Sequence, residues 1–562
     1  MTPATLEEIE QDLRRAELIG AYDKARACLE AGVDDPRLRY LSVLALARAG
    51  ATAKAATQYR ALRLNRLGDV DSLALWARIR KDAALAAPPE RRGPLLAQAA
   101  RAYHRVFRKS RDPFPGINAA TLSALAGQRQ DAGRIASTLL DDGLLHEPES
   151  YWPAATRAEA LAVLGRWEEA ADALRRAREL AGADYGALSS TRRQLAALLG
   201  ETDPDPARSH DLLDILAPPK VAHLRAGEVA ADEEAEAAAA VSATLRREAV
   251  GFAVGTLWST GSLAMAEQAL AAGVELHLVL PFAEQDYLSF FADRSPAAEV
   301  ARRRHCLASA ATVTSATADG DWPDPQLIAY AELIARGLAR TRARRLCTDC
   351  VTVEIGGREP EAAPAAAAPA PDTGTAPHRE VRAFLFADVY RFSSIPESQL
   401  PGFWSDYMAA IGRVIDGFAG QVLYRNTWGD AFFLVIDEIE AAAGLALSIQ
   451  EEAARMRRES RFAPELRIGL HHGPVFKGWD PIRGVASYFG TQVSRAARVE
   501  PVAPPGAVYV TEPFAAILET TDTAGFESEY VGRMPLPKKY GEHRMYRLAR
   551  RWGPAPGRAR SA

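Results

Sequence analysis

Two aspartates stand at the ends of apolar runs in the last third of the 562-residue sequence. Asp388 closes the run Phe-Leu-Phe-Ala at 384–387, and Asp430 ends the polar stretch Thr-Trp-Gly-Asp between two further apolar runs. Apolar runs on both sides of such a turn predict a β-hairpin, so both carboxylates are expected at strand ends. A Mg²⁺ ion that serves phosphates uses one or two carboxylates, and two such ions can activate a hydroxyl and neutralise a leaving phosphate. Each aspartate alone is also typical of an ordinary turn, and the spacing does not decide whether the two meet.

The segment between the two aspartates must place them. Residues 400–420 carry apolar side chains at helical spacing, which predicts an amphipathic helix. Its aromatic residues are interpreted as core and not as a cofactor site. The spaced residues are Phe403, Tyr407, Ile411, Val414 and Phe418.

Four ordered blocks, "FLFADVYRFSSI", "NTWGDAFF", "LRIGLHHGPVFKG" and "YFGTQVSRAARVEP", resemble the class III nucleotidyl cyclases, which are the adenylate and guanylate cyclases. Four blocks in the same order are far more specific than any one of them. The resemblance covers residues 380–550 and implies a ferredoxin-like α/β fold for 379–550. In this family the 3′-hydroxyl of a nucleoside triphosphate attacks its own α-phosphate, giving a 3′,5′-cyclic nucleotide for second-messenger signalling, and pyrophosphate.

The resemblance implies a binding site for two Mg²⁺ or Mn²⁺ ions. Asp388 matches the first metal aspartate of the family, with the Val389 carbonyl as a further ligand, and Asp430 matches the second. Phe392 and Ser393 match the turn whose backbone amides receive phosphate oxygens.

Two basic residues match the family's transition-state and phosphate-binding positions. Arg498 matches the arginine that stabilises charge in the transition state. Lys538 matches the phosphate-binding lysine, with Lys539 as a one-residue alternative. A cation that meets charge developing only in the transition state contributes several kcal/mol.

Three positions depart from the family pattern. Asn426 stands where adenylate cyclases have a base-reading lysine, Ser487 where its aspartate partner stands, and Ser494 where an asparagine orients the ribose. Asn and Ser donate and accept hydrogen bonds, so they can read a base edge. The base therefore stays open: ATP is expected first as the family's commonest substrate, and a pyrimidine triphosphate is the alternative, as in the cyclases of antiphage signalling. A scaffold whose cyclase fold only dimerises is a second alternative.

Family members work as head-to-tail dimers in which each site takes residues from both subunits. This sequence has one cyclase region that carries both sets, so the resemblance implies a homodimer with two equivalent sites.

The first 205 residues carry apolar side chains at helical spacing. Four stretches begin with a glycine that is expected to end one helix, followed by a second helix with small residues where the pair crosses; this resembles the tetratricopeptide repeat (TPR). A generic helical bundle is the competing interpretation, and either structure would bind a protein partner or sense a signal. The stretches carry Gly20, Tyr22, Ala25 and Leu29; Gly50, Ala55, Tyr59 and Leu62; Gly127, Ala132, Ala136 and Leu139; and Gly165, Trp167, Ala170, Leu174 and Ala177.

Residues 206–357 alternate short apolar runs with helical patterns, which predicts βαβ units and a parallel sheet. The region resembles the Rossmann-type domain of lysine-decarboxylase-like nucleotide-binding proteins. Its loop "GTLWSTGS" at 255–262 could receive a phosphate at a helix start, but it lacks G-x-G-x-x-G, and a sheet that only packs between its neighbours is favoured. Cys347 and Cys350 have no second pair with which to hold zinc, so packing is expected for them.

The remaining features concern boundaries and environment. Residues 358–378 form a Pro/Ala linker, and 551–562 a basic tail that is expected to be disordered. The net charge of −4 gives no reason to expect nucleic acid as a partner. The start has no signal-peptide pattern and no apolar stretch is long enough to span a membrane, so a cytoplasmic protein is expected.

Overall fold

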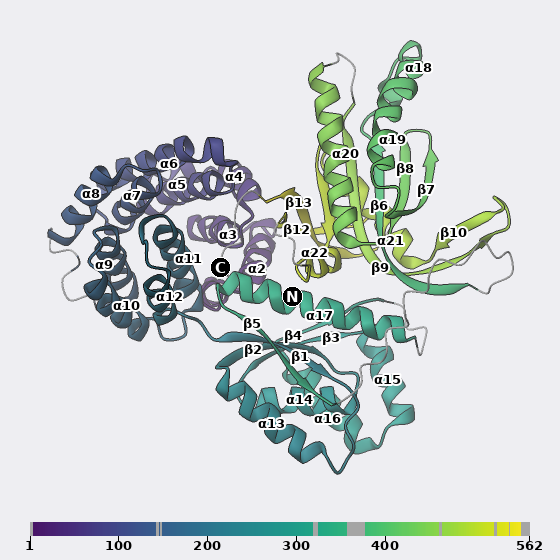
Figure 1. The fold of residues 1–562 in the computed structure, drawn as a ribbon, viewed down its shortest axis with the longest axis horizontal. Coiled ribbons are helices and arrows are strands. Elements are labelled where there is room, and N and C mark those ends of the chain that lie inside the picture. Colours follow the sequence, from purple (N-terminus) through teal and green to yellow (C-terminus); the bar gives the residue numbers. More distant parts are fainter. Residues whose placement is uncertain are drawn as a thin grey trace.

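The computed structural model describes residues 4–141, 145, 149–318, 324–356, 377–459, 464–521, 525–538 and 540–551. Three architectures follow one another along the chain: helices alone, a parallel sheet with helices, and a mixed sheet with helices. Figure 1 shows the helical arc at the left, the parallel sheet below and the mixed sheet at the upper right. The predicted multidomain fold class is confirmed.

The helical region is built from short helices joined by tight turns. Asp35, Asp69, Asp112 and Asp184 each accept a hydrogen bond from a backbone amide at the start of a helix, which fixes where that helix begins. The helices are α1 (Leu6–Arg14), α2 (Leu18–Glu30), α3 (Pro36–Arg48), α4 (Thr52–Ala61), α5 (Val70–Leu85), α6 (Pro89–Ser110), α7 (Pro113–Leu125), α8 (Arg129–Asp141), α9 (Tyr151–Val163), α10 (Trp167–Ala181), α11 (Tyr185–Thr202) and α12 (Pro206–Ile215), with a 3₁₀ turn at Leu64–Arg66.

Three of the four predicted glycine stops are confirmed. Gly50, Gly127 and Gly165 follow α3, α7 and α9 with φ of 83°, 78° and 72°, a conformation in which glycine carries no Cβ penalty. The prediction for Gly20 is wrong, because this residue lies inside α2. The break before α2 falls at Ala16 instead, which takes a φ of 58°.

The middle region is a five-stranded sheet, all parallel, in the order β4-β3-β2-β1-β5. The predicted strand–helix–strand unit is confirmed as β2, α14 and β3. The strands are β1 (Lys220–Ala226), β2 (Val250–Thr256), β3 (Glu275–Leu280), β4 (Thr312–Ser315) and β5 (Cys350–Ile355), and the helices are α13 (Glu234–Arg247), α14 (Thr260–Ala271), α15 (Glu284–Arg294), α16 (Ala297–Ser309) and α17 (Pro325–Leu346).

The helix start that was considered for a phosphate is filled by the chain itself. The Glu228 carboxylate accepts hydrogen bonds from the Thr260 backbone amide at 3.2 Å and from the Thr260 hydroxyl at 2.9 Å. Gly261 packs so tightly that a Cβ there would stand 2.4 Å from the Gly227 carbonyl oxygen. The donors at the start of α14 therefore already face a carboxylate.

The last region is an eight-stranded sheet in the order β12-β13-β11-β9-β6-β8-β7, with β10 paired to β9. The hairpin predicted around Asp430 is confirmed as β7 and β8. The strands are β6 (His378–Val389), β7 (Val422–Trp428), β8 (Ala431–Ile436), β9 (Leu466–Asp480), β10 (Val485–Phe489), β11 (Val508–Thr511), β12 (Phe526–Pro535) and β13 (Glu542–Arg550), and the helices are α18 (Leu400–Gly402), α19 (Ala409–Asp416), α20 (Ile439–Glu459), α21 (Thr491–Val499) and α22 (Glu512–Leu518), with 3₁₀ turns at Phe392–Ser394, Glu397–Gln399 and Glu500–Val502 and a π-helical turn at Phe403–Met408.

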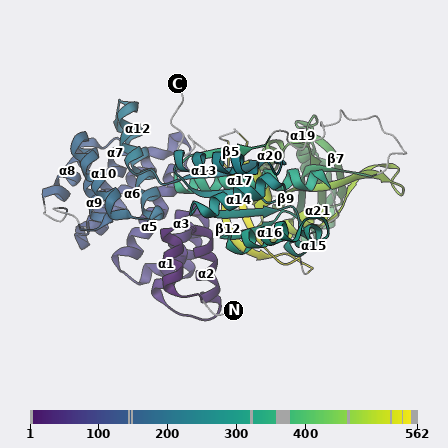
Figure 2. The same ribbon diagram turned by 90° about the horizontal axis from the view of Figure 1, so that it is seen from below.

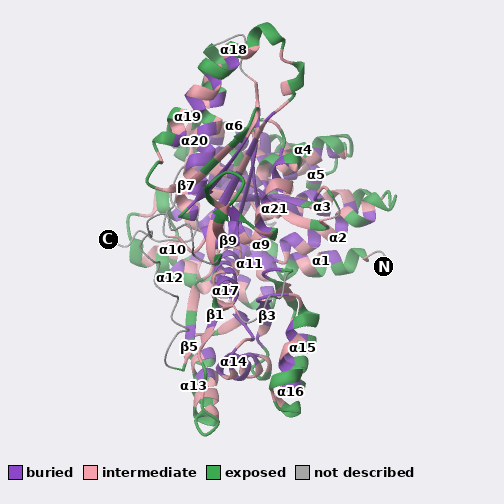
Figure 3. Cartoon of the chain, turned by 90° about the vertical axis from the view of Figure 1, so that its right-hand side faces the viewer, coloured by how far each residue is buried: buried purple, intermediate pink, exposed green. Residues whose placement is uncertain are grey.

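Helices cover both faces of this sheet. Successive side chains of β6 point to opposite faces, so each face contributes apolar residues to its own core. Leu385 belongs to the large core that includes α19, α20 and α22, and Phe403, Tyr407 and Ile411 are buried in it, as predicted. Phe384 points to the other face and packs in a smaller cluster with Ala496 of α21. Figure 3 shows this buried interior in purple within an exposed rim.

Helix α17 joins the parallel sheet to the mixed sheet. It crosses α22 so closely that a Cβ on Gly337 would stand 2.1 Å from the Ala516 carbonyl oxygen. The Tyr330 hydroxyl donates to the His472 carbonyl, and Arg340 donates to the Thr520 carbonyl at 2.6 Å. The middle region is thus packed against the mixed sheet through buried contacts.

Helix α2 joins the helical region to the edge of the same sheet. Asp23 accepts a hydrogen bond from the Tyr530 hydroxyl at 2.6 Å and pairs with Arg533 at 3.1 Å. At the start of α4, the Ala53 amide donates to the Glu529 carboxylate at 2.8 Å. Tyr530, Arg533 and Glu529 all lie on β12. The helical region therefore contacts this strand at several points. Figure 2 shows the three regions from below.

Some predictions fall on other parts of the chain. The linker at 358–378 and the tail at 551–562 lie, apart from 377, 378 and 551, outside the described residues. Cys347 is buried and Cys350 is partly buried, and neither forms a disulfide. No helix among the described residues is long and apolar enough to cross a membrane.

Candidate active site

The two aspartates lie side by side where β6 ends and β8 begins, in the interior of the mixed sheet. Asp388 lies at the end of β6, directly opposite Ala431, the first residue of β8. Asp430 precedes Ala431 in the β7–β8 turn, and its carbonyl accepts a hydrogen bond from the Val389 amide at 3.3 Å. Hairpin closure and antiparallel pairing of β6 with β8 thus bring both carboxylates and the Val389 backbone together.

The charge on these aspartates is only partly balanced. Burial and then the nearby Asp388 charge raise the pKa of Asp430. Arg467, which pairs with Asp388 in the β6–β9 register, holds the Asp388 carboxylate at 2.6 Å. Among the described residues, Arg467 is the one cation that forms an ion pair with either aspartate, an arrangement that fits a divalent cation with oxygen ligands.

A third carboxylate lies behind Arg467. Glu500 forms an ion pair with Arg467 at 2.9 Å and is 8% exposed. Burial raises the pKa of Glu500 to about 7. The Arg467 charge lowers this pKa, and the Asp388 and Asp430 charges raise it further. The sequence analysis missed both Arg467 and Glu500. The sequence held no local signal for either, because Arg467 meets Asp388 only through the β6–β9 register.

The turn after β6 is a 3₁₀ turn at Phe392–Ser394. Arg391 before it takes a φ of 59°, which turns the chain sharply at the strand end. Phe392 is anchored by its ring against the Phe403 ring at 5.2 Å, while Ser393 is exposed. The Phe392 side chain therefore anchors the turn to the helical segment that follows, while Ser393 faces solvent.

Ser494 and Arg498 lie one helical turn apart on α21, so they share one face of that helix. The Arg498 guanidinium stands over the Tyr540 ring at 5.8 Å. Its Nε is buried and finds no hydrogen-bond partner among the described residues. A buried donor without a partner is costly, so this guanidinium is suited to an acceptor that a ligand brings.

Lys538 lies in the connection between β12 and β13 with a φ of 60°, and its side chain is exposed. Its neighbour Lys539 is outside the described residues. Across the described part of the chain, neither Lys538 nor Arg498 forms a hydrogen bond or ion pair with Asp388 or Asp430. The structure groups the candidate residues into separate sets rather than into one closed site.

Asn426 and Ser487 lie on β7 and β10, with Tyr424 between them. The Ser487 hydroxyl donates to the Tyr424 hydroxyl at 3.4 Å, and Arg483 also donates to it. Tyr424 and Asn426 are two residues apart on one strand and therefore share a face. Tyr424 is a further polar group that the sequence analysis missed, although its place two residues before Asn426 indicated it.

Apolar side chains are exposed on the β9–β10 hairpin beside this set. Ile482 at the tip is 94% exposed, and Trp479, Val485 and Phe489 are exposed nearby. Trp428 of β7 is exposed by 56%. A row of large exposed apolar residues in one region is typical of a surface that another protein covers.

Comparisons with known proteins agree with this architecture. Residues 375–550 match the family model of the adenylate and guanylate cyclase catalytic domain, and residues 17–123 match a model described as Tetratricopeptide Repeats-Sensor. No curated protein matches the chain.

Similar solved structures are cyclase domains, each matching about a third of this chain. One is the guanylate cyclase domain of RhGC from Catenaria anguillulae in complex with GTP (19% identity, 31% of this chain and 99% of that chain, TM-score 0.27). Another is the adenylyl cyclase CyaB from P. aeruginosa (14% identity, 31% and 96%, TM-score 0.28). A third is the catalytic core of a rhodopsin-guanylyl cyclase with converted specificity in complex with ATPαS (21% identity, 31% and 99%, TM-score 0.27).

Proposed function

We propose, from the premise that residues 375–550 are an adenylate and guanylate cyclase catalytic domain and hence a phosphorus–oxygen lyase, that this chain cyclises a nucleoside triphosphate for second-messenger signalling. The observation that carries the proposal is the meeting of Asp388 and Asp430 at one strand edge. The 3′-oxygen forms a bond to the α-phosphorus, the bond from that phosphorus to the bridging oxygen breaks, and pyrophosphate leaves. The 3′-hydroxyl proton passes to water.

The metal ligands in this proposal are Asp388, Asp430 and the Val389 carbonyl, for Mg²⁺ or Mn²⁺. Bound ions would acidify the 3′-hydroxyl and neutralise phosphate charge. The fit rests on the donor set, because two carboxylates and a backbone carbonyl are the oxygen ligands that these ions prefer. Burial and then the Asp388 charge raise the pKa of Asp430, and a cation would offset both. Arg467 must leave Asp388 when a cation arrives, and Glu500 offers it a second partner at 2.9 Å.

The remaining residues position the substrate. The amides of Phe392 and Ser393 are assigned to phosphate oxygens, and Lys538 to the terminal phosphates. Arg498 is assigned to the charge that grows on the reacting phosphate, because its buried Nε lacks a partner among the described residues. Ser494, on the same helix face, is assigned to the ribose.

The base is assigned to Asn426 and Ser487, with Tyr424 beside them. ATP is proposed as the substrate, with a pyrimidine triphosphate as the alternative. The three side chains all donate and accept hydrogen bonds, and none carries a charge that selects one base.

We further propose a homodimer in which each site draws Asp388 and Asp430 from one subunit and Arg498 and Lys538 from the other. Two observations support it: these sets share no hydrogen bond or ion pair within the described chain, and the β9–β10 hairpin exposes large apolar side chains such as Ile482. An isologous pair then has two equivalent sites.

The proposed domains are 1–205, 206–357 and 379–550, joined by the linker at 358–378. Leu212 and Leu216 pack in the core of the helical region, so we move the first boundary to follow Leu216. We propose that the two N-terminal domains regulate the cyclase domain by docking, which the contacts of α2 and α17 support. In the competing scaffold function, the same contacts hold an inactive dimerisation module.

Incubation of the purified chain with each of the four nucleoside triphosphates, with Mg²⁺ or Mn²⁺, tests the function. Mass spectrometry should find a 3′,5′-cyclic nucleotide and pyrophosphate from at least one of them, and none with Asp388→Asn. Absence of a cyclic product from all four, in protein shown to be folded and dimeric, would favour the scaffold.

A further inference from the structure

A groove of about 570 Å³ opens on the helical region, away from the strand edge of the mixed sheet. It lies between the end of α4, the 3₁₀ turn that follows and the start of α5. Its volume is in the range of small-molecule sites. The lining residues are Tyr59, Arg60, Arg63, Asn65, Arg66, Leu73 and Trp76.

The rim of the groove is strongly basic. Arg60, Arg63 and Arg66 are exposed, and none forms an ion pair with another described residue. The two acids that follow are used elsewhere, since Asp69 caps α5 at 2.8 Å and Asp71 pairs with Arg37 at 3.5 Å. Neither acid forms an ion pair with an arginine of the groove, although the Asp69 charge, after burial, helps to raise the pKa of Tyr59 to about 12.

One of these arginines is held in an unusual conformation. Arg63 has a φ of 55°, where a side chain other than glycine costs about 1 kcal/mol or more. This conformation ends α4 and turns the chain into the 3₁₀ turn that carries Asn65 and Arg66. The same left-handed conformation ends α6 at Arg111 and α17 at Cys347, so at Arg63 it shapes the groove without itself marking a site.

The wall of the groove is aromatic. The Tyr59 and Trp76 rings stack at 5.0 Å with an angle of 27° between them, and Arg60 stands over Trp76 at 5.0 Å. The Tyr59 hydroxyl is fixed on the Ser72 carbonyl at 3.0 Å. Tyr59 is 3% exposed and supports Trp76 from the interior, so the ring that the groove can offer to a planar group is the partly exposed Trp76. The guanidinium groups beside it offer charge to an anion.

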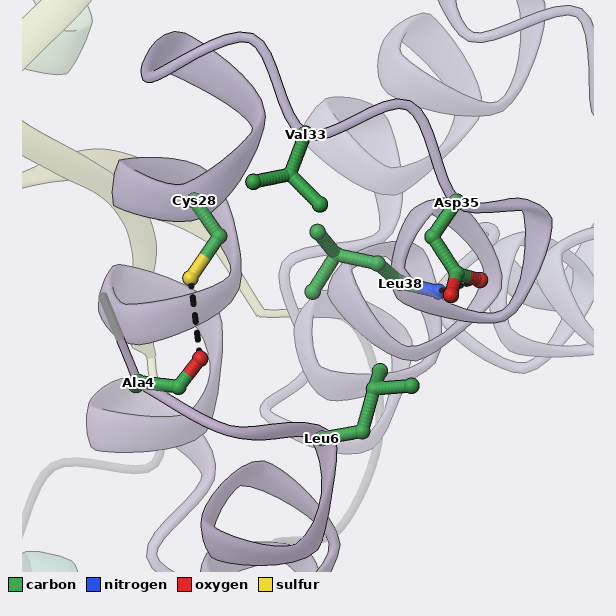
Figure 4. A pocket seen from close by; sticks show the side chains of 6 residues that line it. All are labelled: Ala4, Leu6, Cys28, Val33, Asp35 and Leu38. Carbon is green, nitrogen blue, oxygen red and sulfur yellow. Dashed lines mark hydrogen bonds between the residues drawn. The ribbon is translucent and has the colours of Figure 1, made fainter.

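Two other features of the molecule are less suited to a ligand. A smaller pocket of about 210 Å³ between α1, α2 and α3 is shown in Figure 4. Its Cys28 thiol donates to the Ala4 carbonyl at 3.3 Å and its Asp35 caps α3, so its polar groups are occupied. The cluster of Glu17, Glu275 and His277 already contains Arg342, which pairs with both carboxylates.

We propose that the groove binds a nucleotide, with the base against Trp76, which Tyr59 supports from the interior, and the phosphates on Arg60, Arg63 and Arg66. Arg60 then turns from the Trp76 ring to the phosphates. Arginine forks bind phosphate oxygens in pairs, and stacking of one base on an aromatic side chain contributes about 1–3 kcal/mol. An aromatic wall that adjoins three unpaired arginines matches a ligand that carries both a ring and phosphate. An acidic peptide would use the arginines and leave the wall without a partner.

The groove has a direct structural connection to the cyclase domain. Tyr59 and Arg60 lie in the last turn of α4, while the Ala53 amide in its first turn is held by Glu529 of β12. A ligand that shifts the end of α4 would therefore move a helix whose other end contacts the catalytic sheet.

Binding is tested on the full chain with Asp388→Asn, in EDTA, so that metal-dependent binding at the catalytic site is suppressed. The probes are adenosine, AMP, ADP, the four nucleoside triphosphates, 3′,5′-cyclic AMP and pyrophosphate, measured by calorimetric titration. One variant changes Arg60, Arg63 and Arg66 together to Ala. A second variant changes the same three residues to Lys, which keeps the positive charge and removes the forked guanidinium group. The matched control changes Arg101, Arg105 and Arg108 to Ala, three exposed arginines of α6 outside the groove.

We expect at least one nucleotide to bind with a Kd in roughly the micromolar range. The Ala variant should weaken this binding by about tenfold or more, the Lys variant less, and the α6 control less than about twofold. Equal losses in the groove and control variants, pyrophosphate binding as tight as any nucleotide, or no nucleotide bound in the millimolar range would each overturn the proposal. Capture of a glutamate-rich peptide by the groove in place of nucleotides would do the same.

Discussion

In both the parallel sheet and the mixed sheet, a strand ends near an acidic side chain, but the two carboxylates differ in whether they already have hydrogen-bond partners. In the parallel sheet, Glu228 lies at the start of α14 and takes its donors, at 2.9 and 3.2 Å from Thr260. In the mixed sheet, Asp388 and Asp430 face each other's charge, and Arg467 holds only one of them. The Glu228 carboxylate is satisfied by hydrogen bonds within the chain. The Asp388 and Asp430 pair keeps negative charge that a ligand could balance. A strand end is therefore a candidate site only when its polar groups lack partners.

The largest expected effect separates these two strand ends. Asp388→Asn and Asp430→Asn should each lower kcat on the order of 10³-fold, because each removes a proposed metal ligand. Glu228→Gln, the matched control at the other strand end, should change kcat by less than about twofold, since it keeps the hydrogen-bonding shape. Initial rates of cyclic nucleotide formation measure all three. A comparable loss in Glu228→Gln would contradict the distinction between the two ends.

The second prediction concerns how the mixed sheet completes its site. Asp388→Ala and Arg498→Ala chains should each be inactive alone. Mixed in equal amounts with subunit exchange, they should regain about a quarter of wild-type activity, because half the dimers are heterodimers with one intact site. No recovery, with exchange verified by a tagged subunit, would indicate a site built within one chain.

The third prediction uses the buried carboxylate behind Arg467. The pKa of Glu500 is about 7 in the folded chain, raised above its usual 4.5 mainly by burial. A raised acid pKa lowers the free energy of unfolding as pH rises through it. In EDTA, wild type should lose on the order of 2 kcal/mol between pH 5 and 8 relative to Glu500→Gln. Denaturation midpoints measure this, with exposed Glu397→Gln as control; parallel pH curves for Glu500→Gln and wild type would refute it.

The smallest expected effect concerns the grip of α2 on the edge of the mixed sheet. Asp23 holds Arg533 at 3.1 Å on β12 and Arg544 at 3.8 Å on β13, the two strands joined by the Lys538 connection. Asp23→Asn should raise KM for the nucleotide about threefold, as expected for a partly exposed ion pair. Asp12→Asn breaks the pair with Lys24 inside the helical region and should leave KM unchanged. Equal KM values for both variants would mean that this grip does not position Lys538.

The sequence predicted the fold classes well because their signals are local. Alternating apolar runs predicted β2, β3 and the β7–β8 hairpin, and glycine stops predicted three helix ends. The Gly20 prediction failed because Ala16 takes the left-handed conformation at that break, which no residue preference indicates. Arg467 and Glu500 were missed because they meet Asp388 only through the β6–β9 register and the end of α21, contacts that depend on the whole sheet.

Mn²⁺ binding measured by electron paramagnetic resonance tests the central claim most directly, in the presence of 3′-deoxynucleoside triphosphates, which bind but cannot cyclise. Wild type and Glu228→Gln should bind the ion equally, with at least one of the four nucleotides. Asp388→Asn and Asp430→Asn should each weaken it by about tenfold or more. Undiminished Mn²⁺ binding by both aspartate variants would show that the edge formed by β6 and the β7–β8 turn is not the metal site, and would contradict the account.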